Sequence, residues 1–257
     1  MSKLSFTTPF RDAWAAWRQD STLLLPLAGL TMFLPQLAVY LLVPRLVLPM
    51  EEGAASDPAA QQAMVTAMSE WLSQYGGWYL LAPLCGLFGA LTVMVLYLAP
   101  TRPTLGGALG RASALFLRYL LASILLGFAA APVLGFGLVS PVLVFFLMPL
   151  AFYLLGRTML TGPAIVSAAP IGAIAAIQRS WALTRGNGWM LGATYAAPMF
   201  VTQIVVSALL GFDTLGGGNP VIGAIVDGLA ALTGAASALT LALVEVALYR
   251  RFANTGT

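Results

Sequence analysis

The sequence predicts an all-α integral membrane protein whose 257 residues form one domain with six transmembrane helices. Composition supports this class, because 60% of residues are hydrophobic and only 8% are charged, against roughly a quarter in a soluble domain. Six apolar stretches are also long enough to cross about 30 Å of hydrocarbon as helices. The predicted spans cover residues 21–48, 76–99, 119–138, 139–160, 189–210 and 221–249.

The apolar stretches favour helices over strands. They lack the alternation of polar and apolar residues that a transmembrane barrel requires. Their prolines are expected to kink helices rather than prevent them. The first stretch is too long for a signal peptide and has no small-residue cleavage site after it, so we expect it to be retained as span one.

The basic residues predict the orientation. Of the twelve lysines and arginines, all but Arg45 lie before span one, between spans two and three, between spans four and five, or after span six. The opposite face carries the acidic residues Glu51, Glu52, Asp57, Glu70 and Asp213. The positive-inside rule then places both termini in the cytoplasm, in agreement with an even number of spans. The net charge of +3 therefore reflects orientation, and no nucleic-acid-binding patch is predicted.

The three cytoplasmic segments before spans one, three and five predict amphipathic helices lying in the membrane plane. Each has apolar residues three or four apart and two arginines six or seven apart. The apolar stripes are Phe10, Trp14 and Trp17; Leu105, Leu109, Ala112 and Phe116; and Ile174, Ile177 and Trp181. The arginine pairs are Arg11 and Arg18, Arg111 and Arg118, and Arg179 and Arg185. Such arginines extend to lipid phosphates.

Each in-plane segment runs into a span with a later proline, at Pro35, Pro132 and Pro198. This pattern suggests a degenerate threefold repeat of in-plane helix, span and span.

On the outer side, residues 56–76 predict a short helix with Ser56 or Asp57 as its cap. Whether that helix is a lid or a surface connector stays open.

Span six carries two carboxylates and a stripe of small residues. Asp227 and Glu245 are 18 residues apart, which places them on one helix face about 27 Å apart. Intramembrane acids are candidates for function. For Glu245 we expect a structural role near the interface, with Arg250 or Arg157 as partner, whereas Asp227 could be structural or functional. The stripe predicts a central, buried helix, with a dimer interface as the alternative. Its members are Gly228, Ala231, Ala235, Ala238 and Ala242.

The sequence predicts no catalytic residue, metal site or cofactor. It contains no histidine and a single cysteine, Cys85, so the commonest general base and the usual transition-metal ligands are missing. The stretch "GNGWMLG" (186–192) has the glycines of a phosphate-binding loop, but a helix precedes it and a span follows. We therefore interpret Gly186 and Asn187 as a helix end and turn.

Residues 176–189, "AIQRSWALTRGNGW", resemble the signature of a family of bacterial inner-membrane proteins named for the membrane domain of glycerophosphoryl diester phosphodiesterase. The upstream "GRTMLTGPAIV" (156–166) also fits that family. The resemblance implies six spans, cytoplasmic amphipathic segments and a bacterial inner-membrane location. In fused members, hydrolysis belongs to a separate soluble barrel with histidines and acidic metal ligands. This chain has no histidine, and no stretch outside its spans approaches the roughly 250 residues that such a barrel needs, so we expect no enzymatic activity.

Three functions follow as hypotheses. The first is a non-catalytic protein that organises or senses lipid, or supports another membrane protein. Its expected contacts with membrane phospholipids are Arg179, Arg185, Trp181, Trp189, Arg111 and Arg118. The second is a small transporter or channel with Asp227 on a polar path. The third, a lipid-modifying enzyme, needs clustered polar groups at one membrane depth, and the sequence offers no such cluster. The oligomeric state is not predicted.

Overall fold

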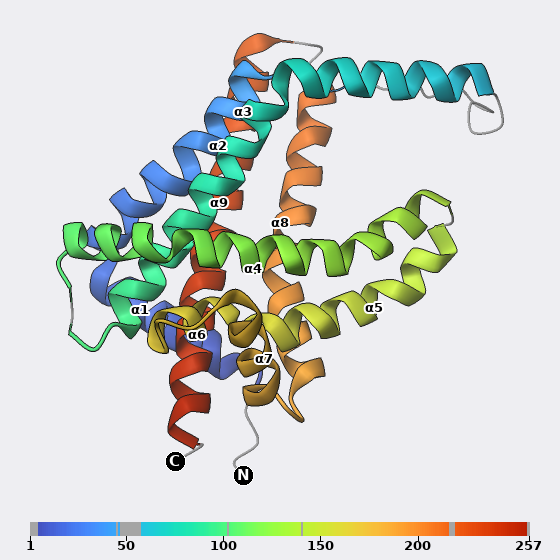
Figure 1. Ribbon diagram of the computed structural model, residues 1–257. Helices are drawn as coiled ribbons and strands as arrows, with labels where there is room; N and C mark the ends of the chain where they lie inside the picture. Colours follow the sequence, from blue (N-terminus) through green and yellow to red (C-terminus); the bar gives the residue numbers. More distant parts are fainter. Residues whose placement is uncertain are drawn as a thin grey trace.

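The computed structural model describes residues 5–44, 46, 58–101, 103–139, 141–215 and 219–255, which form helices and no strands (Figure 1). Its elements are α1 (Thr7–Ala28), η1 (Gly29–Phe33), α2 (Leu34–Leu42), α3 (Pro58–Leu98), α4 (Leu105–Val139), α5 (Pro141–Thr158), α6 (Thr161–Ser167), α7 (Ala173–Leu183), α8 (Gly188–Leu215) and α9 (Pro220–Thr255).

The described residues contain six helical stretches long and apolar enough to cross a membrane, as the sequence predicts. They are Thr7–Leu42, Ala59–Leu98, Leu105–Ala129, Phe146–Ser167, Gly188–Phe212 and Pro220–Ala253. The protein is therefore a multi-pass membrane protein. Several stretches are longer than the predicted spans, because the flanking segments continue the same helices.

The first span is bent at two places. Asp20 has non-helical dihedral angles (φ −119°, ψ 23°), which places a break at the predicted junction between the first amphipathic segment and span one. Farther along, η1 is a single π-helical turn in which Leu34 N–H bonds to Gly29 O. Pro35 follows directly and cannot donate a backbone hydrogen bond, so the regular helical pattern is interrupted here. Asp20 thus divides α1 into two parts, and η1 separates α1 from α2.

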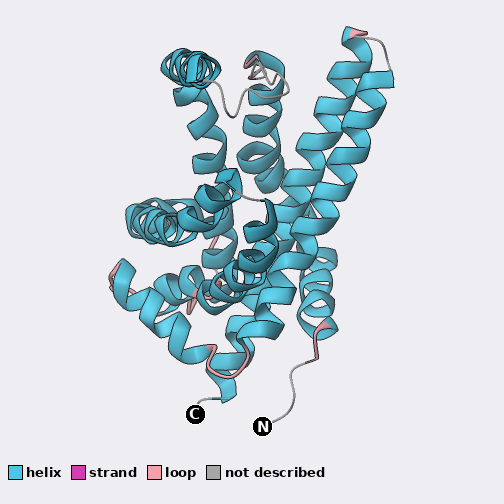
Figure 2. Ribbon diagram, turned by 90° about the vertical axis from the view of Figure 1, so that its right-hand side faces the viewer, coloured by secondary structure: helices cyan, strands magenta, loops and turns pink. Residues whose placement is uncertain are grey.

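Two helices run crosswise to the others. In Figure 1 the first part of α3 and the whole of α4 cross the direction of α8 and α9, and Figure 2 shows both nearly end-on. The outer helix expected at residues 56–76 is thus the beginning of α3, and its expected cap residues, Ser56 and Asp57, lie outside the described residues. Trp71 Nε1 donates to Pro44 O (2.9 Å) and ties this part of α3 to the end of α2.

The three segments of the suggested repeat enter their spans in different ways. The first breaks at Asp20, the second continues unbroken through Tyr119 inside α4, and the third turns between α7 and α8. The expected bend between an in-plane helix and span three is therefore absent from α4. The suggested threefold repeat therefore stays a prediction that the described residues do not show.

Helix α9 is the central element, as the small-residue stripe predicts. It contacts α1, η1, α2, α3, α6 and α8. Ala231, Ala235 and Ala242 of the stripe are buried, while Gly228 and Ala238 are half-buried. Small side chains let helix backbones approach closely in lipid, where packing drives association.

Glycines mark the two tightest helix contacts. A Cβ at Gly156 of α5 would lie 2.2 Å from Gly192 N of α8, so the two backbones touch at this crossing. A Cβ at Gly89 of α3 would lie 2.1 Å from Thr31 Oγ1 in η1. Any larger residue at these positions must displace backbone or a buried side chain.

Candidate functional site

The segment with the family-like sequence forms a corner between α5, α7 and α8, which we call the Arg157 corner. Arg157, near the end of α5, is 6% exposed. Its Nη2 donates to Trp181 O (2.6 Å) and its Nη1 to Thr184 O (3.2 Å). The guanidinium carbon lies 4.4 Å from the centre of the Trp181 ring. The last carbonyls of a helix lack partners within it and carry partial negative charge, so Arg157 stabilises the end of α7.

The remaining polar residues of the stretch complete this corner. Ser180 Oγ and Thr184 Oγ1 both donate to Arg157 O, at 2.9 and 3.0 Å. Gly186 has a φ of +82° in the turn between α7 and α8, which confirms the predicted helix end and turn. A Cβ at Gly188 would lie 2.3 Å from the Tyr153 ring, so glycine lets α8 begin against α5. The polar residues of the stretch thus dock α7 onto α5.

The expected lipid contacts divide into exposed and structural residues. Arg179, Arg185 and Arg118 are exposed, and so are the rings of Trp181 (41%) and Trp189 (64%). Of the arginines, Arg185 also lines a cavity of about 810 Å³ together with Arg157 and Trp181.

Arg111 and Trp189 each have a partner inside the protein. Arg111 is half-buried and donates to Val166 O of α6 at 3.5 Å. The ring centre of Trp189 lies 4.9 Å from that of Tyr153, so one part of this indole packs on α5. The structure therefore gives these two residues a packing role besides any contact with lipid.

A second feature is the α1/α9 groove, an apolar groove of about 670 Å³. Aromatic side chains of α1 and η1 form one wall: Phe10, Trp14, Trp17 and Phe33. Residues of α9 from Leu232 to Leu243 form the other wall. The apolar stripe of the first amphipathic segment thus lines this groove.

Arg11 and Arg18 are exposed beside the groove. At about 100° per residue, Arg11 and Arg18 lie about 60° and 40° from Trp14 around α1, on the side away from Phe10 and Trp17. The exposed ring of Trp14 (61%) therefore separates the apolar wall from two cations. This arrangement joins an apolar slot to a positive edge.

The third feature is the Glu245 cavity, of about 410 Å³. Glu245 lines it together with Tyr40 of α2, Tyr119 of α4 and Tyr195 of α8. The expected partners of Glu245 are engaged elsewhere: Arg157 binds the end of α7, and Arg250 Nη2 donates to Tyr97 O (2.6 Å). Proximity in sequence misled the prediction of an ion pair, because Arg250 points toward α3.

Asp227 is half-buried in α9 and lines none of these cavities. It lies apart from Glu245, as expected from their separation along the helix. The polar path that the transporter hypothesis places at Asp227 is thus not one of the cavities described here.

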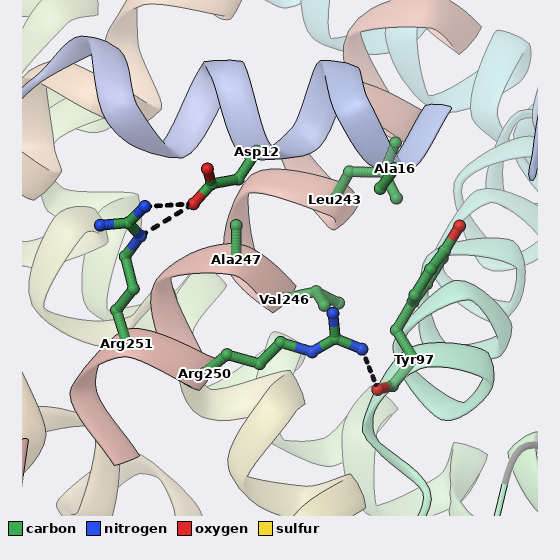
Figure 3. A pocket seen from close by; sticks show the side chains of 8 residues that line it. All are labelled: Asp12, Ala16, Tyr97, Leu243, Val246, Ala247, Arg250 and Arg251. Carbon is green, nitrogen blue, oxygen red and sulfur yellow. Dashed lines mark hydrogen bonds and ion pairs between the residues drawn. The ribbon is translucent and has the colours of Figure 1, made fainter. Parts of the chain in front are cut away.

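Polar contacts at the ends of α1, α3 and α9 hold these helices together (Figure 3). Arg251 donates from Nε (2.8 Å) and Nη2 (2.6 Å) to Asp12 Oδ2. Tyr97 OH donates to Asp20 Oδ2 (2.7 Å) at the break in α1. These contacts bring the beginning of α1 and the end of α9 to the same end of the molecule, where Asp12, Tyr97 and Arg251 line a cavity of about 250 Å³.

Metal ligands do not gather in the described part of the chain, where no three Asp, Glu or Cys side chains form a group that could hold a metal ion. Cys85 is a free, half-buried cysteine of α3.

The sequence analysis predicted neither Arg157 nor the tyrosines around Glu245 as site residues. The signal for Arg157 lies in the lead-in "GRTMLTGPAIV" (156–166), where an arginine closes a span before a proline-containing turn.

Comparison of the chain with protein-family models, characterised proteins and solved structures finds no match. The resemblance of residues 176–189 to the membrane-domain family therefore remains an expectation that rests on that stretch and its lead-in.

Proposed function

We propose that this protein is a non-catalytic bacterial inner-membrane protein that organises or senses lipid by holding a phospholipid in the α1/α9 groove. The observation that carries the proposal is the apolar groove itself, with the exposed Arg11 and Arg18 on the neighbouring face of α1 by helical spacing. The excess of basic residues beside the termini supports a cytoplasmic position for this edge.

The chemistry of the groove fits an acyl chain. Its volume of about 670 Å³ lies within the range of about 300–1,000 Å³ typical of ligand pockets. Its α9 wall extends from Leu232 to Leu243, which is about 16 Å at the helical rise. The groove lies between two helices that we expect to cross the bilayer, so an acyl chain is the occupant that its apolar lining favours.

Selectivity must come from the headgroup and from shape. A lipid tail is already surrounded by hydrocarbon in the bilayer, so entering the groove yields little hydrophobic free energy. Arginine binds phosphate through charge-assisted hydrogen bonds. We therefore expect an anionic lipid, with its phosphate at Arg11 and Arg18 and one chain in the groove.

The test is lipid analysis of the protein purified gently from its native membrane. Ala236→Phe fills the groove from α9, and Ala224→Phe places the same side chain at an exposed position of α9 outside it. We expect Ala236→Phe to lose the retained lipid and Ala224→Phe to keep it. Equal lipid content and composition in both variants would refute the proposal.

The headgroup contact has its own matched test. We expect the paired change Arg11→Gln and Arg18→Gln to lower the enrichment of anionic lipid over the bulk membrane, because the phosphate loses its cations. Arg118→Gln removes an exposed arginine from α4 and should leave that enrichment unchanged. Retained lipid with the bulk composition in the wild-type protein would leave Arg11 and Arg18 as membrane anchors only.

A further inference from the structure

We propose that the Glu245 cavity binds an alkylammonium ion, with its ammonium group at the Glu245 carboxylate and its alkyl chain along α9. This cavity shares only Ala235 of its lining with the α1/α9 groove, and the proposal does not depend on the one made for that groove. Three observations support it: the state of the carboxylate, the side chains around it and the shape of the cavity.

The Glu245 carboxylate lacks a partner in the described part of the chain. It forms no hydrogen bond or ion pair there. The two arginines that the sequence predicted as its partners, Arg157 and Arg250, donate to backbone carbonyls instead. A carboxylate inside a membrane domain is costly unless it is paired, wetted or functional. Because Glu245 lines a cavity, a mobile cation can reach it.

Tyrosines from three helices line the same cavity. Tyr40, Tyr119 and Tyr195 belong to α2, α4 and α8, which are far apart in the sequence. Aromatic rings attract organic cations through their π faces, and a carboxylate attracts an ammonium group by opposite charge. The lining thus offers both kinds of group that hold an ammonium ion.

The rest of the cavity suits an alkyl chain. Along α9 it extends from Gly234 to Glu245, about 16 Å at the helical rise. Gly86, Ala90 and Ala238 are among the small residues that leave this space. The volume of about 410 Å³ lies within the range of about 300–1,000 Å³ for small-molecule pockets.

A divalent metal ion fits this cavity poorly. Calcium takes six to eight oxygen ligands and magnesium demands octahedral geometry, whereas Glu245 is the only carboxylate among the lining residues. The described residues also contain no group of three acidic or cysteine side chains. One carboxylate suits a single positive charge.

The first test measures thermal unfolding of the purified protein in detergent with hexylammonium chloride, and with hexanol at the same concentration and chloride level. We expect the unfolding temperature to rise with hexylammonium and not with hexanol. Glu245→Gln should weaken the apparent affinity at least tenfold, roughly the effect of leaving a buried charge unpaired. Asp227→Asn, which changes the other carboxylate of α9, should keep it. Equal responses to amine and alcohol, or an unchanged affinity in Glu245→Gln, would overturn the proposal.

A second test needs only the wild-type chain and therefore applies even where Glu245→Gln does not fold. Dicyclohexylcarbodiimide, a membrane-soluble reagent for carboxyl groups, is added to protein in phosphatidylglycerol bilayers, and the modification of Glu245 is measured by peptide mass spectrometry. Hexylammonium should slow this modification and hexanol should not. Equal protection by both compounds, or by neither, would contradict the proposal.

The ammonium group could belong to a free amine or to a lipid headgroup, and the same assay separates these sources. Replacing part of the phosphatidylglycerol by phosphatidylethanolamine should protect Glu245 without added amine if the occupant is a lipid. Protection by hexylammonium alone would identify a free alkylamine. An unprotected Glu245 under both conditions would refute the site.

Discussion

Replacing Arg157 tests how the family-like stretch stabilises the fold. Arg157→Gln removes the guanidinium that donates to Trp181 O (2.6 Å) and Thr184 O (3.2 Å) and lies over the Trp181 ring. A hydrogen bond from a charged donor contributes about 1.5–3 kcal/mol, and a cation–π contact adds about 0.5–2 kcal/mol. Two effects reduce the net loss of stability. The substitution removes a charge whose burial is costly, and it removes Arg157 Nε, which has no hydrogen-bond partner.

We therefore expect Arg157→Gln to lower the free energy of unfolding by about 3 kcal/mol, which is about a hundredfold in the unfolding equilibrium. The assay is unfolding in a detergent–denaturant titration, with Arg179→Gln as the control. Arg179 is exposed on the same helix, so its loss should cost less than about 0.5 kcal/mol. Equal stability of the two variants would refute the structural role of Arg157. A further check combines Arg157→Gln with Thr184→Val. The losses in free energy of unfolding should not add in the double variant, because both side chains act at the Arg157 corner.

Three further outcomes are expected. Gly156→Ala should severely reduce the yield of folded protein in size-exclusion chromatography, since its Cβ would lie 2.2 Å from the α8 backbone. Gly228→Ala has open space around it and should behave as wild type, so equal yields of the two variants would contradict the close crossing. Arg251→Gln should lower the free energy of unfolding by less than about 1 kcal/mol, because both side chains of its ion pair with Asp12 are more than a third exposed. A larger loss of unfolding free energy would show that this contact fixes the packing of α1 on α9. Arg185→Glu should reduce lipid crosslinking at the Arg157 corner more than Arg179→Glu does, because Arg185 lines the cavity there, and neither change should affect lipid in the α1/α9 groove. The reverse order at that corner would contradict this difference.

The number of spans and several of their boundaries were predictable because they depend on local composition. The length of apolar sequence identified six helices, and the break at Asp20 lies directly before the predicted start of span one. The turn at Gly186 was predictable for the same reason, because a glycine in a polar break allows a positive φ. The small-residue stripe likewise indicated that α9 is central.

Other features depend on contacts between distant segments. The acceptors of Arg157 are backbone carbonyls of α7, which have no signature in the sequence. Glu245 was assigned an arginine partner from its position in the chain, yet the fold surrounds its cavity with tyrosines from α2, α4 and α8. The predicted span at residues 119–138 ends where α4 ends, but the unbroken course of α4 from Leu105 and its crosswise direction could not be anticipated from composition (Figures 1 and 2).

The most direct test of the lipid-holding account is photo-crosslinking in bilayers that contain an anionic phospholipid with a photoreactive group in its acyl chain. Peptide mass spectrometry then locates the adducts. The account predicts concentrated adducts on the walls of the α1/α9 groove, at Phe10–Trp17 and Leu232–Leu243, and their loss in Ala236→Phe but not in Ala224→Phe. Adducts spread evenly over exposed apolar residues such as Leu117 and Phe128, with no excess in the groove, would contradict it.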